Sequence, residues 1–288
     1  SWRMNPSYGF CKGFDRTIYK RAMSCNEVVN EFYDTNKSFS ERNQFSWLTF
    51  FDTHNPNLIS DINSQISLSP GMLTTDQQSK KKIKSVMFKY NKDQINNYIQ
   101  TLKRIDFYLG DLFNYISRTY DSKDYIISLV SDHGQSFVDD EEYLLKKART
   151  HIPWMITGGD IKSGEEKELT ENIDVFETII NKCNLKTNNE KSDGSVPICL
   201  GGNKKKDYVF TQNIFPNKTY KAVIRDNLNE FRFETINKVE DNGKFIINPY
   251  HYKLLNQSTN KEIINKNLEE KFLKICLDKV ENWNKKII

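Results

Sequence analysis

The sequence predicts an α/β fold: a mixed, mostly parallel sheet flanked by helices, followed by a small C-terminal α+β subdomain of antiparallel strands and a terminal helix. Two observations carry this prediction. Over the first 200 residues, short apolar runs alternate with long segments of helical periodicity, which is typical of α/β folds. Beyond residue 200, short strand candidates follow one another across Asn, Asp and Gly turns. We therefore expect residues 1–200 to form part of an α/β domain and residues 201–288 to form the subdomain.

Three apolar runs in the main domain are candidates for buried strands. They cover residues 45–51, 125–130 and 152–156, and each is too short and too continuously apolar for an amphipathic helix. Between the first two, residues 91–120 repeat apolar side chains every three or four positions, which predicts a long helix packed across a sheet. Residues 173–183 repeat the pattern and predict a second, shorter helix.

The subdomain is expected to be a strand meander with a charged amphipathic helix over residues 262–284. The strand candidates are residues 208–210, 221–225, 231–235 and 244–247. A helix near residues 26–33 is also expected ahead of the first strand.

Composition narrows the class of protein. The chain has 288 residues, of which 37% are hydrophobic and 28% charged, so it can bury one large core. Its net charge of +4 is not gathered into a basic arm, and we expect no nucleic-acid partner. No apolar run approaches the ~20 residues that a membrane helix needs, and we expect no transmembrane segment in this chain. The oligomeric state is not indicated.

The five cysteines do not form a zinc-binding pattern, because no two lie in a Cys-x-x-Cys pair. Their odd number and wide spacing give no disulfide framework. Cys183 and Cys199 could close a loop with a disulfide in an oxidising compartment.

Three of the four histidines lie at the ends of predicted core strands. Asp132 and His133 directly follow the second strand, His54 follows the first, and His151 directly precedes the third. Because ligands bind at the carboxyl ends of strands in open parallel sheets, Asp52 and His54 after the first strand and Asp132 and His133 after the second are expected to converge on one site. His151 lies before its strand, but three histidines at three strand ends are unlikely to be accidental. Carboxylate suits calcium, magnesium or manganese, and imidazole suits zinc.

Each of these short strings also has a plain structural interpretation. Asp132-His133-Gly134 could be a turn or a helix cap, with the glycine allowing the backbone to turn sharply. His151 taken alone would more often be structural, and His251, which lies in the subdomain, is expected to be structural.

Several segments, in the same order, resemble the sulfatase family of the alkaline phosphatase superfamily. They are Gly13-Phe14-Asp15, FFDTHNP (50–56), the helix over 98–113, SLVSDHG (128–134), RTHIPWMI (149–156), Asp174 with Thr178, Asp193-Gly194 and residues 252–255. The order makes the resemblance far more specific than any single segment, and it covers nearly the whole chain.

The resemblance implies a metal-dependent hydrolase of sulfate esters. It implies that Asp132 and His133 bind the metal, and that His54 binds the anion or protonates the leaving oxygen. His151 would be a second metal ligand or a leaving-group contact, and Lys146 and Lys147 are candidates for binding the substrate anion. The metal would be calcium in a sulfatase, and zinc, magnesium or manganese if the chemistry is phosphoryl transfer. The substrate would be a small-molecule or glycan ester, and a secreted, periplasmic or lysosome-like location is implied.

The chain also departs from the family pattern. No Cys-x-Pro-x-Arg or Ser-x-Pro-x-Arg nucleophile motif occurs in these residues, nor do the early acidic metal ligands. We expect the nucleophile to lie outside this chain, which would then be weakly active or inactive by itself. Two alternatives stay open: a phosphoryl-ester hydrolase or phosphoethanolamine-type transferase of the same superfamily, and a non-catalytic binding protein that keeps the fold.

Overall fold

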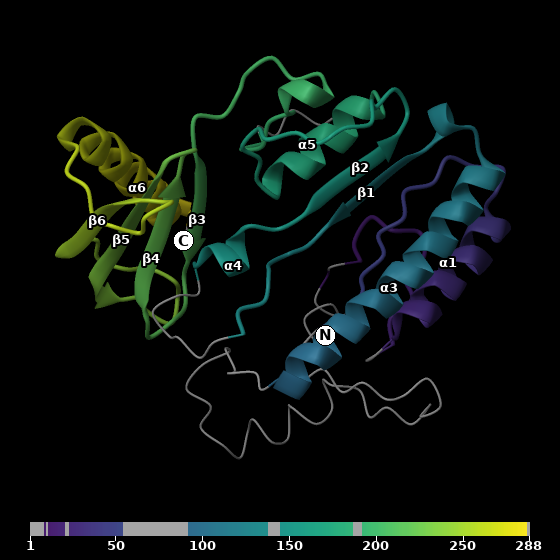
Figure 1. Cartoon of the computed structure of the whole chain (residues 1–288), viewed down its shortest axis with the longest axis horizontal. Helices are drawn as coiled ribbons and strands as arrows, with labels where there is room; N and C mark the ends of the chain where they lie inside the picture. The colour runs from purple at the N-terminus through teal and green to yellow at the C-terminus, as the bar shows by residue number, and fades with distance from the viewer. Residues whose placement is uncertain are drawn as a thin grey trace. The chain divides into compact units, whose positions relative to one another are not determined.

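The computed structural model describes residues 9, 11–20, 23–53, 92–137, 145–186 and 192–286 (Figure 1). The chain divides into two compact units. The first comprises Ser1–Asp121 with Phe137–Asp139, and the second comprises Ser122–Ser136 with Asp140–Ile288. The expected domain boundary after residue 200 stays a prediction.

The first unit is built on two helices that the sequence predicted. They are α1 (Cys25–Ser38) and α3 (Lys92–Thr119), and α3 matches the long helix expected over residues 91–120. The two helices pack side by side (Figure 1), and the ring centroids of Tyr33 and Tyr115 lie 4.6 Å apart between them.

The strand predicted over residues 45–51 is not formed. The segment is irregular, and no described segment pairs with it in a sheet. Phe45 and Trp47 are 60% and 67% exposed, so the aromatic run is not buried as its composition suggested. A strand requires a partner for its backbone N–H and C=O groups, and apolar composition alone cannot provide one.

The second unit begins with a short 3₁₀ turn, η3 (Ser122–Asp124), and a two-stranded sheet. β1 (Ile126–Val130) and β2 (Trp154–Gly158) fall on two of the predicted strands. They pair antiparallel, from Ile126 opposite Gly158 to Val130 opposite Trp154. The helix α5 (Ile173–Lys182) matches its predicted range.

The expectation of a mostly parallel sheet is not confirmed. Every strand pair in the described residues is antiparallel, and parallel pairing is limited to an isolated bridge between Pro216 and Val239. A parallel neighbour needs a long crossover, usually a helix, to bring the chain back to the starting edge. The described part of the connection between β1 and β2 contains only the one-turn helix α4 (Lys147–Thr150), so β2 returns in the opposite direction.

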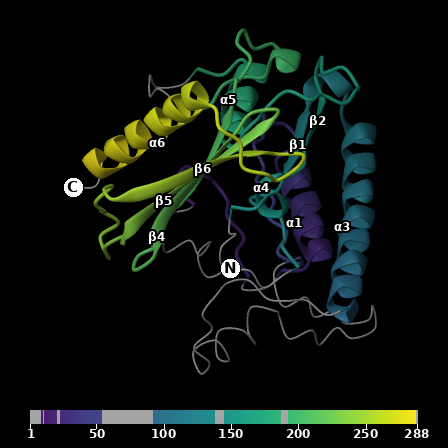
Figure 2. The ribbon, with the colours of Figure 1, turned by 60° about the vertical axis from the view of Figure 1, so that its left-hand side comes forward.

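The C-terminal part of the second unit is the predicted antiparallel sheet with a terminal helix. The strands lie in the order β3, β4, β5, β6, and α6 runs along one face of this sheet (Figures 1 and 2). The elements are η5 (Ile198–Leu200), β3 (Val209–Asn213), β4 (Thr219–Arg225), β5 (Asn229–Lys238), β6 (Tyr250–Asn256) and α6 (Lys266–Lys286).

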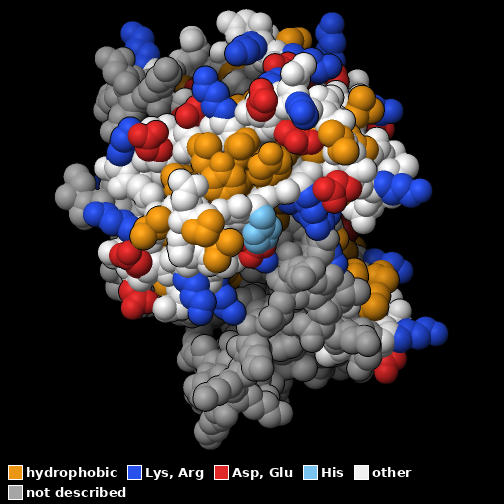
Figure 3. Space-filling model, turned by 90° about the vertical axis from the view of Figure 1, so that its left-hand side faces the viewer, with side chains coloured by type: hydrophobic (Ala, Val, Ile, Leu, Met, Phe, Trp, Pro, Cys, Tyr) orange, Lys and Arg blue, Asp and Glu red, His pale blue; other side chains and the backbone are white. Residues whose placement is uncertain are grey.

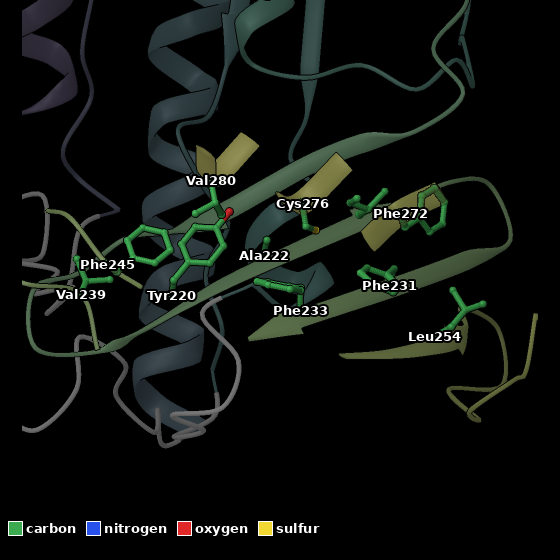
Figure 4. Packing of buried hydrophobic residues seen from close by; sticks show 11 residues of the cluster. Tyr220, Ala222, Phe231, Phe233, Val239, Phe245, Leu254, Phe272, Cys276 and Val280 are labelled. Carbon is green, nitrogen blue, oxygen red and sulfur yellow. The ribbon is translucent and has the colours of Figure 1, made fainter. Parts of the chain in front are cut away.

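Alternation along the strands builds the core between this sheet and α6. Side chains two residues apart on a strand point to the same face, and those of β4 and β5 that face α6 are almost fully buried (Figure 4). The cluster contains Tyr220, Ala222, Ile224, Phe231, Phe233, Val239, Phe245, Leu254, Phe272, Cys276 and Val280. The opposite face of the sheet carries charged side chains instead.

The strand predicted over residues 244–247 is also not formed, and β6 starts later, at Tyr250. Phe245 is buried in the core, as an apolar strand residue would be. However, its backbone bonds to the side chain of Asn284 on α6: the Asn284 amide donates to the Phe245 carbonyl at 3.0 Å, and Asn284 Oδ1 accepts from the Phe245 N–H at 3.4 Å. A helix side chain therefore satisfies the groups that a neighbouring strand would otherwise bind.

One face gathers hydrophobic side chains in its middle, with Lys, Arg, Asp and Glu around them (Figure 3). Within the described ranges, no helix is long and apolar enough to cross a membrane. The disulfide considered between Cys183 and Cys199 is absent, since both are exposed free thiols.

Candidate metal and anion site

The chain leaves β1 through a tight polar turn at Ser131, Asp132 and His133. The Ser131 hydroxyl donates to the His133 carbonyl at 2.7 Å, and the His133 N–H donates to Asp132 Oδ1 at 2.8 Å. These bonds use the backbone and one carboxylate oxygen. They leave Asp132 Oδ2 and the His133 imidazole at the surface, where the side chains are 85% and 50% exposed.

A backbone carbonyl selects one tautomer of the neutral His133 ring. His133 Nδ1 lies 2.9 Å from the carbonyl oxygen of Gly134. A carbonyl oxygen can only accept, so Nδ1 carries the proton in this contact. In the neutral ring, Nε2 then holds the free lone pair, which is the arrangement that metal-binding histidines adopt.

The spacing of these two side chains fits a shared divalent cation. His133 Nε2 and Asp132 Oδ2 are 3.6 Å apart. Two ligands of a tetrahedral zinc ion would be roughly 3.4 Å apart. Two ligands at right angles on calcium would also be roughly 3.4 Å apart. The pair therefore suits either ion. In the described part of the chain, no group of three or more His, Cys, Asp or Glu side chains forms a complete cation site.

Gly134 joins the end of β1 to the α4 turn. Its N–H donates to the Arg149 carbonyl at 2.8 Å. The two backbones approach so closely that a Cβ atom on Gly134 would lie 2.1 Å from the Ala148 carbonyl oxygen. Glycine is thus required here for the close approach of two segments as well as for the turn that the sequence suggested.

The α4 turn carries three of the predicted site residues. Lys146 precedes its first residue, and its carbonyl accepts from the N–H groups of Arg149 and Thr150 at 2.8 and 3.0 Å. The His151 N–H donates to the Lys147 carbonyl at 2.8 Å and closes the turn. Lys147 and His151 are four residues apart on this turn, so their side chains leave it on the same side, and both residues are exposed.

Arg149 is a member of this region that the sequence did not single out. Burial lowers the pKa of its guanidinium, and the nearby Asp132 carboxylate opposes that shift. Arg149 is therefore a cation close enough to the candidate metal ligand Asp132 to interact with it electrostatically. Its position directly before the Thr-His pair was the only signal in the sequence.

Asn172 is a second residue that sequence reasoning missed. It lies at the start of α5, and its side-chain amide donates to the carbonyls of Ser131 and Asp132 at 3.1 and 3.3 Å. α5 is thereby tied to the turn that presents Asp132 and His133. Nothing in the local sequence indicates a bond across some forty residues.

The motif residue Asp174 has a structural role. It is 1% exposed, and it accepts from the N–H groups of Glu171 and Ser195 at 2.7 and 2.8 Å. The Lys206 ammonium lies 2.8 Å from the same carboxylate and also bonds to Glu171. Gly194 is required for a close approach too, because a Cβ there would lie 2.2 Å from the Ile173 carbonyl oxygen. The two resembling motifs therefore fasten α5 to the following segment.

Asp52 also has a structural role, within the first unit. Its side chain is 2% exposed and accepts from Arg104 at 2.7 Å and from the Cys25 N–H, the first residue of α1, at 3.1 Å. His54, predicted to contact the anion, lies outside the described residues. His251 lies in β6, with Nε2 3.6 Å from Glu234 Oε2, and its structural role stays a prediction.

The second unit thus brings together five predicted site residues on two bonded segments: Asp132, His133, Lys146, Lys147 and His151. A strand end with an exposed carboxylate and imidazole, set beside a turn rich in cations, defines a candidate site for a divalent cation and an anionic ester. Comparison with known families agrees with this class. The family model described as Sulfatase matches residues 2–183, more than half of the chain, so the chain belongs to the sulfatase family.

The sulfatase family consists of hydrolases whose substrates are sulfate esters, and its members generally use a divalent metal. A search of curated proteins found no match to this sequence.

Proposed function

We propose that this chain provides the metal-binding and anion-binding half of a sulfate-ester hydrolase. The observation that carries the proposal is the hydrogen bond from Gly134 to Arg149. It joins the strand end bearing Asp132 and His133 to the turn bearing Lys147 and His151. A cation held by the first pair would therefore be close to the lysine ammonium groups and the His151 imidazole of the second segment.

The chain's own residues have separate tasks in this proposal. Asp132 and His133 hold a divalent cation, which when bound polarises the non-bridging oxygens of the ester and stabilises charge developing on them. Lys146 and Lys147 attract the anion. The exposed His151 imidazole donates a proton to the leaving oxygen, which removes the cost of expelling an alkoxide. His54 is proposed as a further contact to the anion.

Calcium is the cation we propose for sulfate-ester chemistry, since a carboxylate is a hard oxygen ligand. We further propose that the nucleophile is supplied by residues other than these 288, which contain no Cys-x-Pro-x-Arg or Ser-x-Pro-x-Arg segment. Turnover by this chain alone is then expected to be weak or absent, because covalent catalysis contributes orders of magnitude in rate.

Binding of inorganic sulfate, measured by calorimetry with and without added calcium, tests this function without depending on the nucleophile. We expect calcium-dependent sulfate binding that the Lys147→Gln/His151→Gln variant weakens. Matched Lys204→Gln/Lys205→Gln substitutions, at exposed lysines far along the chain, should leave it intact. Sulfate binding that ignores both calcium and the Lys147/His151 change would contradict the proposal.

Phosphoryl-ester chemistry is the second candidate, favoured by the Thr150-His151-x-Pro153 segment next to Asp132-His133-Gly134. The His133 lone pair at Nε2 suits zinc as well as calcium. Inorganic phosphate binding that is stronger than sulfate binding, and that needs zinc or manganese instead of calcium, would favour this candidate over the first.

A further inference from the structure

We propose that Arg225, on β4 of the C-terminal sheet, is a positioning residue that holds the anion-binding turn at residues 145–151 in place. The inference rests on the proposed function of that turn. It assigns to the C-terminal subdomain a direct part in shaping the site, through one side chain.

The Arg225 guanidinium is buried and uses all three of its nitrogen atoms. Its Nε donates to Glu230 Oε2 at 2.6 Å within the sheet. Its Nη1 donates to Thr150 Oγ1 at 2.8 Å, and its Nη2 donates to the Leu145 carbonyl at 2.6 Å. Only arginine offers this planar fork, so the side chain can pair with its own sheet and bind two points of the turn together.

Those two points lie on either side of the functional residues. Leu145 directly precedes Lys146, and Thr150 directly precedes His151. Thr150 Oγ1 also donates to the Lys146 carbonyl at 3.1 Å, which extends the same network to the first lysine. Arg225 therefore fixes both ends of a turn that is only one helical turn long and too short to be stable alone.

A second cross-strand ion pair in the same sheet shows that pairing the two strands does not require an arginine. Lys221 and Glu234 face each other across β4 and β5, as Arg225 and Glu230 do, and their charged atoms are 3.2 Å apart. An ammonium suffices for that cross-strand pair. The Arg225 guanidinium forms the same kind of pair and also donates two hydrogen bonds to Thr150 and Leu145, outside the sheet. We therefore infer that an arginine at this position stabilises the turn.

Glu230 orients the guanidinium in turn. Its other oxygen accepts from Arg232 Nε at 2.5 Å, so the carboxylate is held from both sides. A carboxylate fixed by two arginines keeps the Arg225 plane at one angle, with the remaining nitrogens directed at Thr150 and Leu145.

The test combines amide hydrogen exchange with calorimetric binding of inorganic sulfate, using the whole 288-residue chain. Three variants report on the role: Arg225→Lys keeps the charge but loses the fork, Thr150→Val removes one acceptor on the turn, and Thr150→Ser restores the hydroxyl. Lys221→Gln is the control, since it breaks the matching ion pair on the same face of the sheet.

In Arg225→Lys and Thr150→Val, we expect the amides of Arg149, Thr150, His151 and Gly134 to exchange on the order of five to ten times faster. Sulfate should bind more weakly by a similar factor, and Thr150→Ser should bind nearly as the wild type does. Lys221→Gln should speed exchange in β4 and β5 while leaving the turn and the affinity unchanged.

Three outcomes would overturn the inference. Exchange at the turn that stays at the wild-type rate, or that rises no more than exchange in the sheet, would make Arg225 a stabiliser of the sheet alone. Unchanged sulfate affinity in both variants would exclude positioning while leaving the proposed function intact. Absence of sulfate and phosphate binding in the wild type would instead contradict the proposed function, and the positioning role would fall with it.

Discussion

Replacing Asp174 with alanine should strongly lower the free energy of unfolding of the second unit. The contacts that it removes are made by residues outside the candidate site. The carboxylate is 1% exposed and binds two backbone N–H groups, those of Glu171 and Ser195. It also lies 2.8 Å from the Lys206 ammonium, whose side chain is 16% exposed. The substitution leaves two donors without this acceptor and a largely buried cation with only Glu171 as its anionic partner.

The magnitude follows from these contacts. Hydrogen bonds to a charged group contribute about 1.5–3 kcal/mol each. Removing one partner of a buried ion pair costs about 3–5 kcal/mol. The terms overlap because they share one carboxylate, so they do not add. Lys206 also keeps Glu171, and we expect a loss of about 4 kcal/mol for Asp174→Ala and about 2 kcal/mol for Asp174→Asn.

Urea denaturation followed by circular dichroism measures this loss, and Asp193→Ala is the matched control. Asp193 belongs to the other resembling motif, but its side chain is 73% exposed and 3.9 Å from Lys279. Its removal should change stability by less than about 0.5 kcal/mol. A loss under about 1 kcal/mol for Asp174→Ala would refute the buried-anchor role. Equal losses in both variants would refute it as well.

Three further predictions concern Gly134, Glu230 and the cysteines. Gly134→Ala should separate β1 from the α4 turn, because its Cβ would lie 2.1 Å from a carbonyl oxygen, and calorimetry should show sulfate binding weakened by at least about tenfold. The control Gly110→Ala meets open space inside α3 and should raise the unfolding free energy by about 0.5–1 kcal/mol. Burial alone would raise the pKa of Glu230, but the charges and hydrogen bonds of its two arginine partners outweigh burial and hold that pKa below 4.5. The stability difference between wild type and Glu230→Gln should therefore be complete above pH 4.5 and shrink as pH falls below it. In alkylation followed by mass spectrometry, exposed Cys183 should react first, ahead of Cys199, which is also exposed but whose pKa is raised by partial burial of the thiol. Cys25 should stay protected until unfolding, because burial raises its pKa to about 11.

Each of these has a clear opposing result. Full sulfate affinity in Gly134→Ala would mean that the close approach is not needed for the site. A stability difference for Glu230→Gln that is constant across acid pH would mean that its ionisation does not contribute to folding. Labelling of Cys25 in the folded chain as fast as Cys183 would contradict its burial at the start of α1.

Helices were predicted well because their signal is local. The repeat of apolar side chains that builds α3 is contained in one segment, and it predicted both ends within a residue or so. The strands were harder. Phe45 belongs to an apolar run that finds no described strand partner, and Phe245 satisfies its backbone through a helix side chain. Pairing partners are distant in sequence, and composition does not identify them.

The residues of the candidate site also fall into two groups, those that the sequence indicated and those that it did not. Asp132, His133 and His151 could be found because they are adjacent to apolar runs and match family segments. Arg225 and Asn172 could not, because each acts through a bond to a segment far away in the chain. The direction of pairing was missed for the same reason, since the return of the chain from β1 to β2 depends on a connection whose path the sequence does not state.

Metal content measured by elemental analysis tests the central claim most directly, namely that Asp132 and His133 hold a divalent cation. The chain provides an unusually close control, because His251 Nε2 and Glu234 Oε2 are also 3.6 Å apart, with Lys221 beside them. We predict a stoichiometric divalent metal in the wild type and in Glu234→Ala/His251→Ala, and its loss in Asp132→Ala/His133→Ala. Metal retained in the Asp132/His133 variant, or lost equally from both variants, would contradict the account.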